Sequence, residues 1–152
     1  MKTTLEFSLH IAAPRSVVWQ HMLTDAGYRD WTSVFCAGSY FLGSWHVGAE
    51  IRFLSPGGDG MVAEIAEHRL HERVSIRHLG DIVAGVEDRD SERARSIYPA
   101  YETYETFDMA NDGEGTLLRV CVDAVPEFEA FLSDTYPKAL QRLKAICEGL
   151  PH

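Results

Sequence analysis

The final quarter of the sequence carries a broad apolar stripe at helical spacing, and this stripe limits the folds that the chain can adopt. It begins after Pro126, a residue suited to the first turn of a helix. The stripe comprises Phe128, Phe131, Leu132, Tyr136, Ala139, Leu140, Leu143, Ile146 and Cys147. It covers about half of the helix circumference, which is wider than the seam of a coiled coil. We therefore predict one long C-terminal helix that lies across a large apolar surface.

Much of the remaining chain alternates between apolar and polar residues, with the period of two that is typical of half-buried strands. We predict a first strand over residues 4–12 and then two short helices between residues 14 and 30. Further strands are expected near residues 34–42, 49–55, 61–68, 72–79, 100–110 and 116–124. Short, glycine-rich connections favour an antiparallel meander. The predicted fold class is α+β, with a curved antiparallel sheet of about seven strands wrapped around the C-terminal helix.

Residues 81–98 interrupt this pattern with a run of charged side chains between Glu87 and Arg95. The segment is too charged for a central strand and too long for a tight turn. We interpret it as a solvated loop, with a mobile lid over a pocket as the alternative.

The size and charge of the chain limit its organisation and its partners. Its 152 residues, of which 45% are hydrophobic, predict a single domain over residues 1–152. The net charge of -9 would repel nucleic acid and anionic membranes, so neither is expected as a partner. Neither a membrane-spanning run nor the apolar core of a signal peptide is present in the sequence, which predicts a cytoplasmic protein.

The sequence lacks the spacing patterns of common metal and nucleophile sites. Cys36, Cys121 and Cys147 are widely spaced and are predicted to pack as small apolar side chains. His68 and His71 have no third ligand at a usable spacing, so we predict no metal. Neither a nucleophile elbow nor a phosphate-binding loop occurs, and we expect no cofactor.

Polar side chains that face the predicted interior are candidates for ligand contacts, because an unpaired buried polar group costs on the order of a few kcal/mol. On the strand over residues 72–79, His78 shares a face with Val74 and Ile76, which directs its imidazole inward if the strand has no bulge. His78 is therefore a candidate catalytic or binding residue. A core histidine bonded to a backbone carbonyl is the alternative.

Either face of the predicted strand over residues 100–110 could point toward the interior. One face carries Tyr101, Thr103, Glu105, Phe107 and Met109. Its apolar members indicate that this face points inward, whereas a bulge would place Glu102 and Tyr104 inside instead. Either arrangement brings a carboxylate and a tyrosine into the interior, so Glu102 and Glu105 join His78 as catalytic candidates. Burial would raise the pKa of such a carboxyl group unless a cation such as His78 pairs with it.

The order of the predicted elements resembles the helix-grip fold of the START-like (SRPBCC) superfamily. The residues are most similar to the branch related to the C-terminal domain of the Hsp90 ATPase activator. This similarity is carried by residues 11–19, residues 23–25 with Trp31, and residues 47–53, 115–118 and 136–144. The resemblance covers essentially the whole chain. It implies a ligand cavity between the sheet and the C-terminal helix, and it does not imply a particular reaction.

Aromatic and polar residues of this interior predict a binding site for a small apolar or aromatic molecule, such as a lipid or a polyketide. The predicted ligand-binding residues are Trp31, Phe35, Tyr40, Trp45, Phe53, His78, Tyr101, Glu102, Tyr104, Phe107, Phe128, Phe131, Leu132 and Tyr136. For any single aromatic residue, plain core packing is the alternative.

Three functions are compatible with the sequence. The first is a binding protein for a small molecule. The second is a cyclase-, dehydratase- or hydrolase-like enzyme that uses His78 and a carboxylate as an acid–base pair, as some START-like relatives do. The third, regulation of a chaperone ATPase, follows from family analogy alone. We favour the binding protein over an enzyme, and a homodimer is compatible with the sequence.

Overall fold

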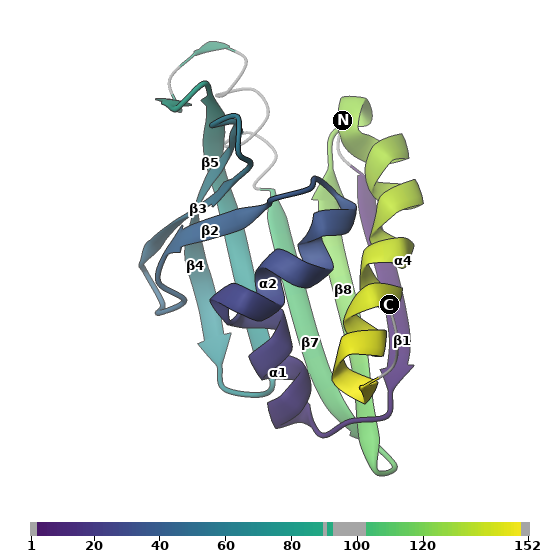
Figure 1. Cartoon of the computed structure of the whole chain (residues 1–152). Coiled ribbons are helices and arrows are strands. Elements are labelled where there is room, and N and C mark those ends of the chain that lie inside the picture. Colours follow the sequence, from purple (N-terminus) through teal and green to yellow (C-terminus); the bar gives the residue numbers. More distant parts are fainter. Residues whose placement is uncertain (1–2, 90, 93–102, 150–152) are drawn as a thin grey trace.

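The computed structural model describes residues 3–89, 91–92 and 103–149, which form an α+β fold (Figure 1). The elements are β1 (Thr3–Ile11), α1 (Arg15–Leu23), α2 (Asp25–Trp31), the 3₁₀-helix η1 (Thr32–Val34), β2 (Tyr40–Gly43), β3 (Glu50–Leu54), β4 (Gly60–Arg69), β5 (Arg73–Val83), β6 (Val86–Asp88), β7 (Tyr104–Asp112), β8 (Gly115–Ala124) and α4 (Pro126–Glu148). The predicted fold class and the predicted long C-terminal helix are confirmed.

The strands form one antiparallel sheet in the order β1-β8-β7-β5-β4-β3-β2. The short strand β6 pairs with β5 beyond this path, so eight strands are described where about seven were predicted. The sheet brings the first strand beside the last, because β1 pairs with β8 from Thr3 opposite Ala124 to Ile11 opposite Thr116. Figure 1 shows α1, α2 and α4 covering one face of the sheet.

The apolar stripe of α4 packs onto this face. Thr135, Tyr136, Ala139, Leu140 and Leu143 are its buried residues. Pro126 occupies the first turn, where its missing N–H costs nothing, and Gly149 ends the helix with a φ of 71°. The ring of Tyr136 stacks on Phe7 of β1 at a centroid distance of 5.1 Å. The helix is thereby attached to the edge of the sheet.

The helices α1 and α2 form a tight corner beside α4. A Cβ atom at Gly27 would lie 1.9 Å from the carbonyl oxygen of His21, so only glycine permits this approach. Trp31 closes the corner, because its indole N–H donates to the carbonyl oxygen of Met22 over 3.1 Å. The corner places aromatic side chains of α2 above the middle of the sheet.

The strand predicted over residues 34–42 begins later, at Tyr40. The preceding residues continue the helical path as η1, where the Thr32 hydroxyl donates to the carbonyl oxygen of Tyr28. Ser39 then donates to the carbonyl oxygen of Cys36 over 2.7 Å. These local bonds replace strand pairing, and they hold Phe35 over the sheet rather than within it.

Within the predicted loop at residues 81–98, the described residues form a hairpin instead. The strand β5 runs to Val83 and pairs with β6 across a turn at Ala84 and Gly85, both of which have a positive φ. The charged side chains pair with β3: Arg89 bonds Glu50 at 2.8 and 2.9 Å, and Arg52 bonds Glu87. This pairing explains why the charged segment holds a strand. The lid alternative falls largely on residues 90 and 93–98, which lie outside the described residues.

A β-bulge in β5 changes which side chains face inward. Val62 of β4 lies opposite Gly80, whereas the next residue, Ala63, lies opposite His78. The extra residue is Leu79. Because a bulge shifts the alternation by one residue, His78 before it and Asp81 after it both turn toward the helices, where both line a pocket.

Candidate ligand-binding pockets

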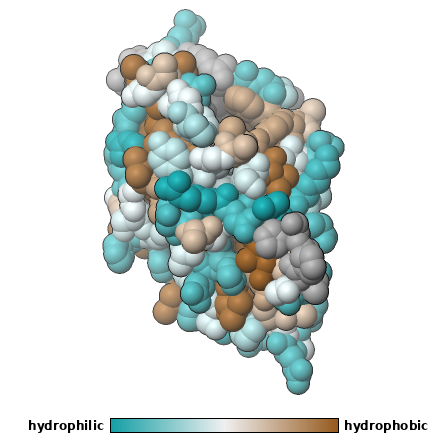
Figure 2. All heavy atoms as spheres, viewed as in Figure 1, coloured by the Kyte–Doolittle hydropathy of each residue, from teal (hydrophilic) through white to brown (hydrophobic). Residues whose placement is uncertain are grey.

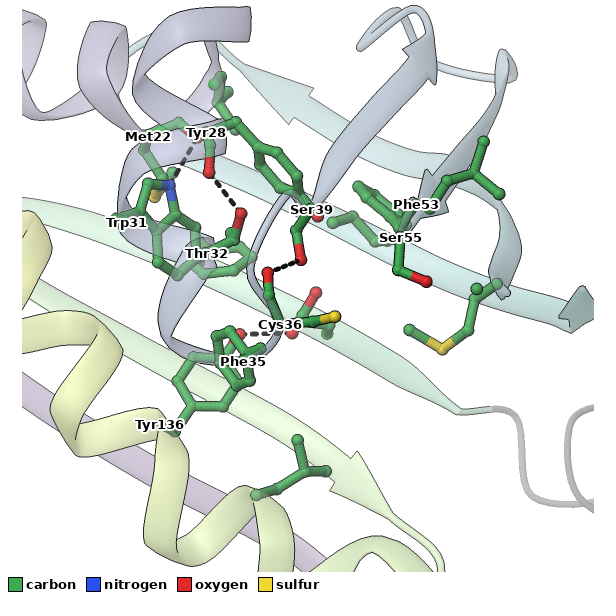
Figure 3. Close-up of a pocket in the computed structure, with 18 of the residues that line it drawn as sticks. Met22, Tyr28, Trp31, Thr32, Phe35, Cys36, Ser39, Phe53, Ser55 and Tyr136 are labelled. Atoms are coloured by element: carbon green, nitrogen blue, oxygen red, sulfur yellow. Dashed lines mark hydrogen bonds between the residues drawn. The ribbon is translucent and has the colours of Figure 1, made fainter. Parts of the chain in front are cut away.

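Two adjoining pockets lie between the sheet and the helices. The first pocket has a volume of about 380 Å³ and has side chains of α1, α2, β3, β4, β7 and α4 around it. Its aromatic wall consists of Tyr28, Trp31, Phe35, Trp45, Phe53, Phe107, Phe131 and Tyr136. Figure 3 shows several of these rings converging from α2, η1 and α4. This volume is within the usual range for small-molecule sites, about 300–1,000 Å³.

The second pocket has a volume of about 270 Å³. His78, Asp81, Thr103 and Asp123 line it together with apolar residues of β8 and α4. Five residues line both pockets, namely Gly60, Met61, Glu105, Phe131 and Leu132. The two pockets therefore meet at one junction, and Glu105 is the ionisable group at that junction.

Glu105 reaches the junction because β7 runs without a bulge. Its register against β5 and β8 is continuous, so Glu105 and Phe107 share the inward face. The Tyr136 hydroxyl of α4 donates a hydrogen bond to Oε2 of Glu105. Burial raises the pKa of Glu105, and this hydrogen bond partly offsets the effect. Burial and the nearby Glu105 charge both raise the pKa of Tyr136, so its phenol stays protonated as the donor.

His78 lines the second pocket and is buried, with 8% of its surface exposed. Burial lowers its pKa from 6.5 to about 4, although the negative charges of Asp123 and Asp81 act in the opposite direction. The imidazole is therefore neutral at pH 7. In this state it can offer one donor and one acceptor, but it does not provide a positive charge to a carboxylate.

Most of the predicted binding residues line one of the pockets. Trp31, Phe35, Trp45, Phe53, Phe107, Phe131, Leu132 and Tyr136 line the first pocket, and His78 and Phe128 line the second. Glu105, which was predicted as a catalytic candidate, lines both. Tyr101 and Glu102 lie outside the described residues. The structure gives the positions of the described residues, and their role in binding stays a prediction.

Two predicted binding residues line neither pocket. Tyr40 packs beneath the guanidinium of Arg29, which lies 5.2 Å from its ring centroid. Tyr104 precedes Glu105 on β7 and therefore faces the other side of the sheet. Its backbone N–H donates to Asp123 over 3.0 Å. The alternative in which a bulge turns Tyr104 inward is wrong, because the register of β7 is unbroken.

Several lining residues were not predicted. Tyr28 lies in the first pocket, and burial together with the Glu105 charge raises its pKa. Its position in a predicted helix, three residues before Trp31, is the signal that could have identified it. Asp81 could not be identified in this way, because only the bulge at Leu79 turns it inward.

The mouth of the pockets is formed in part by the first turns of α4. Phe128 and Phe131 are 38% and 50% exposed, although both line a pocket. In Figure 2, apolar residues lie both above and below a band of hydrophilic residues on the face that is shown. Exposed aromatic side chains at a pocket rim are typical of a site that an apolar ligand enters.

The hydrogen bond between Tyr136 and Glu105 gives a test of the site. We expect Tyr136→Phe to lower the free energy of unfolding by about 1.5 kcal/mol, because the variant leaves a half-buried carboxyl group without its donor. The pKa of Glu105 should rise further, since the bond that lowers it is lost. Urea unfolding measures the first effect, and ¹³C NMR titration of the carboxyl carbon measures the second. Tyr40→Phe removes a hydroxyl at a partly buried position that lines neither pocket, and it serves as the control. An unchanged Glu105 pKa would contradict the assigned bond.

Residues 3–89, 91–92 and 103–149 contain neither a candidate metal site nor a helix that could span a membrane. No group of three or more His, Cys, Asp or Glu side chains in these ranges could hold a metal ion. In addition, none of the described helices is both long and apolar enough to span a membrane.

The order of the strands and the long C-terminal helix are those of the helix-grip fold. No family model matches the sequence, and no curated protein matches it. Among solved structures, the Aha1 dimer from Colwellia psychrerythraea is similar, with a TM-score of 0.73, 19% identity and 96% of each chain covered. The predicted resemblance is thus confirmed at the level of the fold.

Two further solved structures share this fold. CalU16 from Micromonospora echinospora matches with a TM-score of 0.66 and 14% identity, over 96% of this chain and 76% of CalU16. DynU16, a protein in the dynemicin biosynthetic locus, matches with a TM-score of 0.65 and 17% identity. That match covers 97% of this chain and 48% of DynU16. At such identities the similarity shows the fold alone.

Proposed function

We propose that the chain is a binding protein for a small, mainly apolar or aromatic molecule held between the sheet and α4. The observation that carries the proposal is the first pocket, whose wall of aromatic rings surrounds a single carboxyl–phenol pair, Glu105 and Tyr136. Protein interiors are normally packed as densely as organic crystals, and empty space destabilises a fold. A pocket of about 380 Å³ is therefore best explained by a ligand that fills it.

The comparisons support a ligand of this class indirectly. DynU16, which shares the fold, is a protein in the dynemicin biosynthetic locus, so one structural neighbour is linked to a biosynthetic locus. A lipid- or polyketide-like molecule would fit the apolar wall. We further propose that the chain acts as a single domain in the cytoplasm. The dimeric state of the Aha1 structure supports a homodimer, which sedimentation velocity would test.

An enzymatic role is the second candidate. In such a role Glu105, held by Tyr136, is better placed as the catalytic acid than the acid–base pair of His78 and a carboxylate that the sequence predicted. Burial raises the pKa of the Glu105 carboxyl group, which would suit a general acid, and Tyr136 holds that group in place. His78 is neutral at pH 7 and is less suited to stabilise a carboxylate. Loss of turnover in Glu105→Gln, with the affinity for an uncharged ligand retained, would distinguish an enzyme from a carrier. Regulation of a chaperone ATPase is suggested only by the similarity of the fold to that of the Aha1 structure.

A ligand screen by thermal shift tests the binding function. Aromatic, lipid and polyketide compounds are mixed with the protein, and a ligand at 100 times its dissociation constant should add about 2.7 kcal/mol to the free energy of unfolding. For a chain of this length, we expect the melting temperature to rise by about 5–10 °C.

A pair of matched variants locates the effect. Leu132→Trp places a larger side chain where the two pockets meet and should abolish the thermal shift. Leu70→Trp makes the same change at a position that is 62% exposed and should leave the shift intact. A shift that persists in Leu132→Trp would place the ligand elsewhere and overturn the proposed site.

A further inference from the structure

Among the described residues, the charged side chains that line the pockets are all acidic. Four carboxylates line them: Asp59, Asp81, Glu105 and Asp123. Among the described residues, neither lysine nor arginine lines either pocket. The whole chain carries a net charge of -9, so its long-range field has the same sign as the lining. A negatively charged ligand would meet no lysine or arginine among the described residues that line the pockets.

Among these carboxylates, Glu105 is the one placed to contact a ligand in the first pocket. Asp59 is exposed at the rim and accepts from the backbone of Ala84 over 2.8 Å. Asp123 accepts from Thr4 over 2.7 Å and from the Tyr104 backbone over 3.0 Å. Glu105, in contrast, has one oxygen bonded to Tyr136, and in the described part of the chain its other oxygen, Oε1, accepts no hydrogen bond. That oxygen can accept a bond from a ligand.

The rings around Glu105 suit the same type of ligand. Tyr28, Trp31, Phe107 and Tyr136 line the first pocket with Glu105. The faces of aromatic rings carry negative partial charge and attract cations, an interaction that gains strength where water is excluded. A carboxylate among aromatic rings therefore attracts a cation both by its full charge and by the rings around it. The same rings provide apolar area for the uncharged part of the molecule.

We propose that the pockets select an organic amine, whose apolar or aromatic body lies against the rings of the first pocket and whose ammonium group pairs with Glu105. This inference rests on the proposed function and specifies its ligand class. A fatty acid or another carboxylate is disfavoured, because its charge would be buried beside Glu105 with no cation to balance it. A neutral molecule of the same shape would gain the apolar contacts without the ion pair.

The test compares ligands that share a ring system and carry a cationic, a neutral or an anionic polar group. Three scaffolds, phenyl, indolyl and naphthyl, are each used as the ethylamine, the ethanol and the acetic acid, with calorimetry at pH 7. On at least one scaffold, we expect the amine to bind about tenfold or more tightly than the alcohol and the acid to bind more weakly than both.

Matched variants assign the preference to Glu105. Glu105→Gln keeps the shape of the side chain and should remove the advantage of the amine, while the affinity for the alcohol changes by less than about threefold. Glu114→Gln makes the same change of net charge at an exposed turn residue and should keep the advantage. Circular dichroism and the melting temperature establish that both variants fold.

The outcomes separate this inference from the function on which it rests. Equal affinity for amine and alcohol on every scaffold, or an amine advantage that survives in Glu105→Gln, would overturn the amine preference and leave the binding function standing. The same conclusion follows if only neutral or acidic compounds from the wider screen bind. Absence of binding by every compound, amines included, would overturn both proposals.

Discussion

The variant Leu143→Ala is expected to unfold with a free energy about 3 kcal/mol lower than that of the parent chain. Leu143 is fully buried in the core between α4 and the sheet. Truncation removes its buried methyl groups and leaves a void that the packed neighbours can fill only in part, which typically costs about 2–5 kcal/mol. The melting temperature should fall by about 6–12 °C.

Equilibrium unfolding in urea measures this loss. The control is Leu42→Ala, because Leu42 is 54% exposed and its truncation should change the free energy of unfolding by less than about 0.5 kcal/mol. Since Leu143 lines neither pocket, ligand affinity should be retained at temperatures where the variant is folded. A loss below about 1 kcal/mol would mean that α4 does not depend on this contact for its attachment.

The second large effect is a loss of stability in acid that depends on His78. Burial lowers the pKa of His78 to about 4 in the folded chain, whereas an unfolded histidine titrates near 6.5. Between these values the unfolded chain binds the proton and the folded chain does not. The stability contributed by neutral His78 is therefore fully present above pH 6.5 and is lost as the pH falls toward 4. At about 1.4 kcal/mol per pH unit, the loss is about 3 kcal/mol.

Comparison with His78→Gln isolates this contribution. The variant keeps a polar side chain that does not titrate, so its stability should fall by about 3 kcal/mol less than that of the parent chain between pH 7 and pH 4. Glu105 acts in the opposite direction in both proteins, because burial raises its pKa and so favours folding at lower pH. His46→Gln, at an exposed position, is the control. Parallel pH profiles for the parent chain and His78→Gln would contradict the buried neutral imidazole.

The sequence was sufficient to predict the fold because the deciding signals are local and periodic. The stripe of α4 could be read from residue spacing, and its buried members include Tyr136, Leu140 and Leu143 as expected. The face of β7 was also predictable, since Phe107 and Met109 identify the inward side, and Glu105 follows from alternation. For this reason the carboxylate at the junction of the pockets was among the candidate site residues.

The parts that were not predicted depend on contacts between distant segments. The strand β6 lies in a segment too charged to be read as a strand, and its charges are neutralised by Glu50 and Arg52 of β3. Alternation alone cannot reveal the bulge at Leu79, which turns Asp81 inward. Spacing also cannot show that Phe35 follows a 3₁₀-turn rather than the predicted strand. Each of these features is set by pairing that forms only when the chain folds.

The position of Glu105, where the two pockets meet, has a consequence for binding stoichiometry. Together the pockets have room for two small uncharged molecules, and among the described residues Glu105 is the carboxylate that lines both. If the ammonium group of a ligand occupies Glu105 from one side, a second amine entering from the other side would find the counter-ion already neutralised. A second amine would then depend on Asp81 and Asp123 of the second pocket, which already have partners of their own, and should bind more weakly than the first. A neutral compound should show no such difference between its first and second molecule.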